Sequence, residues 1–308
     1  MKMTDDSELA TTHAPVPRYE RSPEQDHPAL PERIVPIDER DAVVAASRLS
    51  PGSRALVTAL LRTSWPHMFA GGGLGIEYGA LLKTAARPDL LAPHVAEVVA
   101  HLRDAEIDLL FVPGMSGYPI GAMYSQASGI PALLLKKQPY PPSEDSDYAP
   151  GAFVIPSYTG GNDTLISADP SAAADILASI VDRQLASQST DGQIQISVRV
   201  AGADEIIDKA TMATAITETA PIFCRSVIDI LLEQRRDQIG ARPVSVDVTV
   251  AAWVTPILKG YNRAAEILQS RCGVSPFAGV TITSLHIDPP AIGIEGIGVL
   301  ACQGDEAT

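Results

Sequence analysis

A short apolar run followed by turn residues constrains the fold of this chain most. Residues 107–114 read IDLLFVPG, an unbroken apolar stretch ending in Pro-Gly, as expected of a strand buried on both faces of a sheet. Small apolar residues at 118–128 predict a helix, Gly129-Ile130-Pro131 ends it, and a second apolar run follows at 132–135. This order predicts a βαβ unit, whose loops lie at the carboxyl ends of parallel strands.

The rest of the chain continues this alternation. Residues 41–63 have helical spacing interrupted at Ser50-Pro51-Gly52, which predicts two short helices. Further patterns predict helices at 88–104, 172–185, 211–233 and 260–271, a β pattern at 194–208, a strand at 244–254, and a final hairpin or edge pair from runs at 280–287 and 292–301. We expect residues 38–308 to form one α/β domain, with a mostly parallel twisted sheet flanked by helices and a small hood from the early helices and final strands. Residues 1–37 are rich in proline and poor in apolar periodicity, which predicts a disordered tail.

Composition and charge exclude several classes of function. The 308 residues include 23 Lys and Arg against 37 Asp and Glu, a formal charge of −14 that argues against a general nucleic-acid-binding surface. No apolar run approaches a membrane span, and acids stand where a secretory signal has its apolar region. Three separated cysteines give neither a disulfide framework nor zinc spacing, and His94 and His101 are predicted to be surface residues rather than ligands. We expect a soluble cytoplasmic protein with no nucleic-acid or membrane partner.

Two adjacent acids mark the most informative position. Asp204 and Glu205 stand where a buried strand would end, before a short loop and the start of a helix. Carboxylates in such an extended turn can accept hydrogen bonds from vicinal sugar hydroxyls or hold a divalent ion. The loop and helix start behind them favour a phosphate. Together these features predict a sugar-phosphate site.

At this segment the sequence resembles the type I phosphoribosyltransferases. The family has an apolar strand, two acids and a Thr/Gly-rich loop that holds the 5-phosphate of phosphoribosyl pyrophosphate (PRPP). Here the segment reads Asp204-Glu205-Ile206-Ile207-Asp208-Lys209-Ala210-Thr211, with the acids and isoleucines in the family's places. The loop is one residue shorter than usual and has no glycine, although Lys209 can supply a charge and Thr211 a hydroxyl.

Other blocks carry the resemblance in the same order. Pro113-Gly114-Met115-Ser116-Gly117 corresponds to the family's pyrophosphate loop, and Lys136-Lys137 to the basic pair before its flexible catalytic loop, here residues 139–150. Upstream, residues 67–91 resemble the opening of orotate phosphoribosyltransferases, with matches at Phe69, Gly72, Tyr78 and Lys83. The resemblance spans about residues 65–290 discontinuously, with an insertion at about 157–192.

The resemblance implies a Mg²⁺-dependent transfer of ribose 5-phosphate from PRPP to a heterocyclic base with release of pyrophosphate, by a homodimer. Asp204 and Glu205 would hold the ribose hydroxyls and the metal, and Asp208 would contact the base or accept a proton. Lys209 and Thr211 would bind the 5-phosphate, and the pyrophosphate would be bound by Ser116, Gly117, Lys136 and Lys137.

Three departures concern the substrate and the chemistry. Orotate enzymes have a lysine where this chain has Ala70, and an arginine in the helix that here begins at 211, where residues 211–219 contain none. The lysine of their mobile loop is absent from residues 138–150, which contain three acids. Orotate is therefore not the expected base. Two alternatives remain: a related protein that binds PRPP or a nucleotide without turnover, and an unrelated α/β enzyme in which the acid pair is structural.

Overall fold

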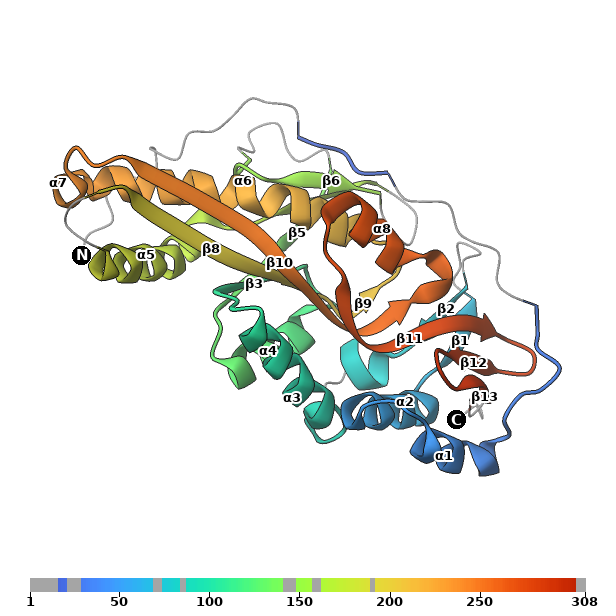
Figure 1. Cartoon of the computed structure of the whole chain (residues 1–308). Coiled ribbons are helices and arrows are strands. Elements are labelled where there is room, and N and C mark those ends of the chain that lie inside the picture. Colours follow the sequence, from blue (N-terminus) through green and yellow to red (C-terminus); the bar gives the residue numbers. More distant parts are fainter. Residues whose placement is uncertain are drawn as a thin grey trace.

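The central sheet organises the molecule (Figure 1). The computed structural model describes residues 16–20, 29–68, 74–83, 87–140, 148–156, 162–188 and 192–302. Within these residues the sheet has eight strands in the order β13-β12-β11-β10-β8-β3-β4, with β9 paired to β10. Strands β3, β4, β8, β9, β10 and β11 run parallel, and β12 and β13 are antiparallel additions. Their bounds are β3 (Leu109–Val112), β4 (Ala132–Leu134), β8 (Ile194–Ala203), β9 (Ile206–Ile207), β10 (Val244–Lys259), β11 (Pro276–His286), β12 (Ala291–Ile294) and β13 (Gly298–Ala301).

Helices cover both faces of this sheet and bury a separate apolar cluster on each. On one face α5 (Pro170–Ser187), α6 (Thr211–Gln234) and α8 (Ala264–Cys272) pack against Val198 and Trp253. On the other face α2 (Pro51–Thr63), α3 (Pro88–Asp104) and α4 (Tyr118–Ser128) pack against Ala203 and Val254. The predicted α/β fold, with a mostly parallel sheet flanked by helices, is confirmed. A short helix, α7 (Arg236–Ile239), connects α6 to β10.

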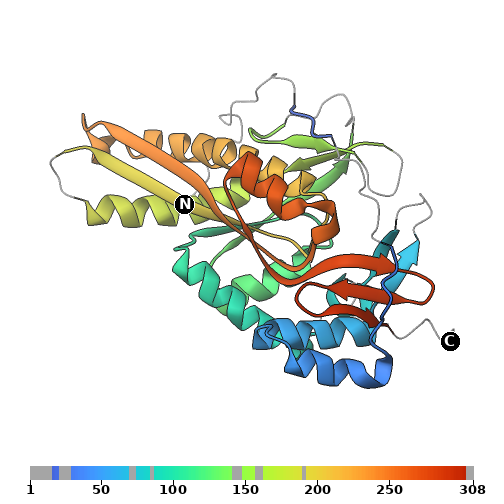
Figure 2. The same ribbon diagram turned by 45° about the vertical axis from the view of Figure 1, so that its right-hand side comes forward.

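Early helices and final strands lie together at one end of the sheet and form a hood (Figure 2). It contains α1 (Ile37–Ala46), α2, the antiparallel pair β1 (Trp65–Met68) and β2 (Leu74–Glu77), and the end of the sheet at β11–β13. The helices separate at Ser50, whose hydroxyl accepts the Ser53 amide at 3.1 Å, with Pro51 in the first turn of α2. A π-helical turn (Gly79–Lys83) follows β2.

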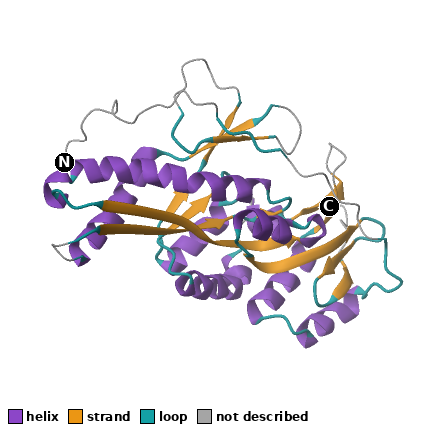
Figure 3. Ribbon diagram, turned by 45° about the horizontal axis from the view of Figure 1, so that its top comes forward, coloured by secondary structure: helices purple, strands orange, loops and turns teal. Residues whose placement is uncertain are grey.

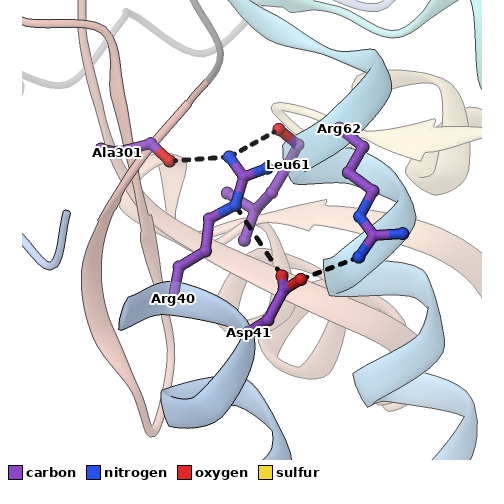
Figure 4. Close-up of polar contacts among 5 residues, drawn as sticks. All are labelled: Arg40, Asp41, Leu61, Arg62 and Ala301. Carbon is purple, nitrogen blue, oxygen red and sulfur yellow. Dashed lines mark hydrogen bonds and ion pairs between the residues drawn. The ribbon is translucent and has the colours of Figure 1, made fainter. Parts of the chain in front are cut away.

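A buried arginine joins three parts of the hood (Figure 4). The Arg40 guanidinium on α1 donates to the Leu61 carbonyl at 3.1 Å and to the Ala301 carbonyl at 3.3 Å. Leu61 lies in the last turn of α2, where carbonyls have no partner within the helix. Asp41 lies 3.8 Å from Arg40 and accepts a hydrogen bond from Arg62 at 2.7 Å. This cluster fixes α1 against α2 and β13.

A second, antiparallel sheet lies beside the first. It has the order β5-β7-β6, formed by β5 (Lys136–Pro139), β6 (Phe153–Ile155) and β7 (Thr164–Ser167). Residues 16–20 add to its β6 edge, where Tyr19 N donates to the Val154 carbonyl at 2.9 Å and Val154 N to the Pro17 carbonyl at 2.8 Å. Val35 likewise pairs with Leu300. The described parts of the expected disordered tail therefore lie against the folded body, because they complete open strand edges.

Strands β8 and β10 extend beyond the rest of the sheet as a two-stranded arm against α5 and α6 (Figure 3). Gln184 of α5 and Gln188, the residue that follows this helix, cover the outer edge of β8. Gln184 exchanges hydrogen bonds of 2.6 and 2.8 Å with the Ser197 backbone, and Gln188 exchanges bonds of 2.5 and 2.9 Å with that of Gln195. Side-chain amides thus take the place of a further strand.

Three local predictions need correction. The strand predicted to end at 254 continues past Pro256 to Lys259. This is possible because the Thr255 hydroxyl, just before the proline, hydrogen-bonds both the amide and the carbonyl of Ile257, just after it. The helix predicted at 260–271 begins only at Ala264, after a 3₁₀ turn and a left-handed Arg263. His94 is fully buried rather than on the surface, with Nε2 2.8 Å from the Tyr124 hydroxyl. None of the described helices combines the length and apolar character needed to cross a bilayer.

Candidate functional site

A cavity of about 380 Å³ opens where β8, β9 and β10 end. Because these strands are parallel, their carboxyl ends meet at one edge of the sheet, which is where open α/β sheets bind ligands. The hood contributes Glu77 and Tyr78 to the wall, and the second sheet contributes Ile155 and Thr164. Seven of the nine predicted site residues line it: Ser116, Lys137, Asp204, Glu205, Asp208, Lys209 and Thr211.

The acid pair lies at the end of β8. The Asp204 carboxylate accepts the Glu205 amide at 2.9 Å, and Glu205, itself buried, accepts a hydrogen bond from the Tyr78 hydroxyl at 3.2 Å. Burial, followed by the negative charge of Glu205, raises the pKa of Asp204 well above its usual value. A cation or hydroxyl donors bound beside this pair would offset the repulsion that Asp204 meets from Glu205.

The loop after β9 leads directly into α6. Ala210 has φ +58°, the left-handed conformation that glycine adopts most easily, so this glycine-free loop still makes a glycine-like turn. No side chain caps the N-terminus of α6, and its first turn has no acid. The buried Thr211 hydroxyl has no hydrogen-bond partner among the described residues. The first amides of α6 and this hydroxyl therefore offer donors to an anion in the cavity.

Asp208 is held by two residues that the sequence did not indicate. Lys259 Nζ lies 3.1 Å from one carboxylate oxygen, and the Asn262 side-chain amide donates to the other. Lys259 and Asn262 are both buried. The role predicted for Asp208, a base contact or proton acceptor, stays a prediction that this ion pair does not favour.

The loop between β3 and α4 approaches the acid pair closely. A Cβ added to Gly117 would lie 2.8 Å from the Pro113 carbonyl oxygen and 3.0 Å from Asp204 Oδ1, so a side chain here would press on the carboxylate. Gly117 therefore allows the backbone of this loop to approach the Asp204 carboxylate closely, although Gly117 does not itself line the cavity. Ser116, next to it, does line the cavity.

The two adjacent lysines point to different places. Lys137 lines the cavity, and its charge lowers the pKa of Asp204, against the larger effects of burial and Glu205. Lys136 instead forms a 2.7 Å ion pair with Asp169, and its side chain is 55% exposed. Successive side chains of a strand point to opposite faces, and both lysines belong to β5, which also includes Pro139, the first residue of the predicted loop. The prediction that Lys136 binds substrate is therefore not supported.

Several sequence matches cannot be placed. Phe69, Ala70 and Gly72 lie outside the described residues, as do the Lys83 side chain and residues 141–147 of the catalytic loop predicted at 139–150. Tyr78 was a family match only, and its contact with Glu205 comes from the packing of the hood. Lys259 is a lone lysine before a glycine, but the strand was predicted to end at 254, before Pro256, so the local pattern did not mark this residue.

The acid pair fits a magnesium ion only in part. Among the residues that the structure covers, no group of three or more His, Cys, Asp or Glu could hold a metal. Asp204 and Glu205 supply two adjacent carboxylates. Mg²⁺ is commonly held by one or two carboxylates together with substrate phosphates, so this donor set fits an ion that arrives with a phosphorylated ligand.

Comparisons with known proteins give a likeness of fold. No protein-family model and no curated protein matches the chain. An APRTase from Giardia lamblia matches at 13% identity over 73% of this chain and 97% of its own, with a TM-score of 0.44. Adenine phosphoribosyltransferases from Rhodothermus marinus (13% identity, 74% and 98% coverage, TM-score 0.41) and Trypanosoma brucei (10%, 75% and 81%, 0.41) also match. At these identities the likeness concerns the fold alone.

Proposed function

We propose that this protein binds PRPP with Mg²⁺ and transfers its ribose 5-phosphate to a heterocyclic base, releasing pyrophosphate. One observation carries the proposal. The Asp204–Glu205 pair lines the same cavity as the uncapped N-terminus of α6, whose Thr211 hydroxyl is buried without a partner among the described residues. A sugar phosphate needs both carboxylates that accept hydrogen bonds from its hydroxyls and backbone amides that bind its phosphate. Few other ligands need these two kinds of group side by side.

Each part of PRPP then has its own group of residues. Asp204 and Glu205 accept hydrogen bonds from the ribose hydroxyls and favour the positive charge that develops on the sugar. Lys209, Thr211 and the α6 amides bind the 5-phosphate. Ser116, the loop at Gly117 and Lys137 face the pyrophosphate, and Mg²⁺ when bound supplies positive charge to that leaving group. A homodimer in the cytoplasm belongs to the same proposal.

The decisive experiment is calorimetric titration with PRPP, with and without Mg²⁺, followed by pyrophosphate release against a panel of bases. We expect Mg²⁺-dependent binding and release with at least one base that is not orotate. Asp204→Asn should weaken PRPP binding by about 10- to 100-fold, because a hydrogen bond to a charged group contributes about 1.5–3 kcal/mol. Asp182→Asn is the matched control, since Asp182 pairs with Arg235 away from the cavity.

A second candidate function is binding without turnover. It is favoured by the shortened, glycine-free loop with Ala210 in the left-handed region and by the absence of lysine from residues 138–150. Binding of PRPP without release from any base would support this sensor. No binding at all, with Asp204→Asn matching the wild type in every titration, would mean that the acid pair is structural in an unrelated α/β protein.

A further inference from the structure

We propose that Lys259 binds the phosphate monoester of the ligand and that Asp208 is its counter-ion. This role rests on the proposed function and deepens it, because it assigns the end of the cavity near Lys259 to the phosphate group and names the charge that binds it. Lys259 is the last residue of β10, its side chain is 4% exposed, and it lines the cavity 3.1 Å from Asp208.

The sheet itself places this lysine beside the loop. Leu258 of β10 pairs with Ile207, the last residue of β9. The residues that follow them, Lys259 and Asp208, are therefore brought side by side. Asn262, in the turn directly after β10, donates to the second oxygen of Asp208. The carboxylate is thereby fixed, and it holds the ammonium at the end of β10, where the loop leads into α6.

Stability alone gives little reason for this buried pair. Removing two charges from water is costly, and apolar residues of similar size often replace a buried ion pair without loss of stability. A lysine and an aspartate kept together at the wall of a cavity therefore suggest a task that needs the charge. The two remaining lysines of the lining, Lys137 and Lys209, come from other elements and approach the cavity from β5 and from the loop.

Binding of a phosphate at the loop between β9 and α6 would need that charge. A phosphate monoester carries up to two negative charges, and the cavity also contains the Asp204–Glu205 pair and Glu77. A glycine-rich loop would wrap its amides around the phosphate, but the segment from Asp208 to Thr211 is short and has no glycine. Lys259 supplies from the adjacent strand the positive charge that the α6 amides alone provide only in part. Bound phosphate and Asp208 then share one buried ammonium.

The test is calorimetric titration of the full chain with ribose 5-phosphate, and separately with Mg²⁺-pyrophosphate. Lys259→Met should weaken ribose 5-phosphate binding by about 10- to 100-fold, as expected for a lost charge-assisted hydrogen bond, while pyrophosphate binding stays within about threefold. Lys259→Arg, which keeps the charge, should recover most of the loss. Lys136→Met is the matched control, because it removes a lysine from an exposed Lys–Asp pair outside the cavity.

Folding is controlled with the double variant Lys259→Met/Asp208→Asn, which leaves no unpaired buried charge. If it melts like the wild type and still loses ribose 5-phosphate binding, the inference holds. If it melts like the wild type and binds ribose 5-phosphate as tightly, the inference is overturned and the pair only stabilises the loop. Titration of the wild type distinguishes this result from failure of the proposed function. If the wild type binds PRPP, only the role of Lys259 is overturned; if it binds neither PRPP nor ribose 5-phosphate, the proposed function itself is wrong.

Discussion

His94 makes the stability of the protein depend on pH. Its ring is fully buried, Nδ1 has no partner among the described residues, and burial lowers its pKa from 6.5 to about 4. Between these values the unfolded chain binds a proton that the folded chain does not. The stabilisation is therefore complete above pH 6.5 and is lost as the pH falls toward 4, by at most about 3 kcal/mol.

His94→Leu should remove this contribution. Urea unfolding at pH 7 and pH 5 would measure it, and we expect the wild type to lose more stability between these two pH values than the variant. His101→Gln should give a smaller change, because His101, which stacks on Phe277 at 4.7 Å, is only partly buried, although that burial also lowers its pKa. Equal losses in wild type and His94→Leu would contradict the assignment.

At the level of single residues, the sequence predicts what is local. Asp204, Glu205, Lys209 and Thr211 follow one strand end within eight residues, so composition and order suffice to bring them together. Lys259 and Tyr78 reach the same cavity through the β9–β10 register and the packing of the hood. Such contacts depend on the tertiary fold, and no local pattern encodes them.

Residues 16–20, which form an isolated β-bridge between Arg18 and Val154, lie against the sheet that forms one wall of the cavity. Arg18 pairs with Asp163 at 3.1 Å and lies over the Tyr140 ring at 5.1 Å, while the Tyr19 hydroxyl donates to Glu218 of α6 at 2.9 Å. These contacts join the second sheet, which contributes Ile155 and Thr164 to the cavity, to the helix behind it.

Replacing Arg18 and Tyr19 together by alanine should loosen this edge without unfolding the molecule. Hydrogen exchange should accelerate at the Val154 amide, which donates to the Pro17 carbonyl, and PRPP binding should weaken by a few-fold. Arg33→Ala is the control, because Arg33 forms an exposed pair with Glu39 in the first turn of α1. Unchanged exchange at Val154 would show that β6 is ordered without the contacts of residues 16–20.

At the level of elements, periodicity and helix ends predicted most helices well. Proline in the first turn and an apolar stripe define Pro88–Asp104, and the left-handed Gly129 ends Tyr118–Ser128. The second sheet was not predicted as a sheet. Its strands are three or four residues long, and β5 reads KKQP, fully exposed, so only pairing with β7 makes it a strand.

Ligand binding should stabilise the whole molecule, because the cavity is assembled from the hood, the central sheet and the second sheet. PRPP with Mg²⁺ at a hundred times its Kd should add about 2.7 kcal/mol to the free energy of unfolding, and raise Tm by several degrees. Fluorescence of the fully buried Trp253 can follow the unfolding. Asp204→Asn should lose most of the shift and Asp182→Asn should keep it. An equal shift in both variants would place PRPP elsewhere on the molecule.

The pairing of Val35 with Leu300 also has a consequence for the order of events during synthesis. Arg40 on α1 needs the Ala301 carbonyl, so this segment has to wait for one that the ribosome makes 261 residues later. The βαβ unit of β3, α4 and β4 can close long before, since all its residues are contiguous. The nascent protein therefore cannot complete its hood until β13 has left the exit tunnel, and until then α1 is open to chaperones and proteases.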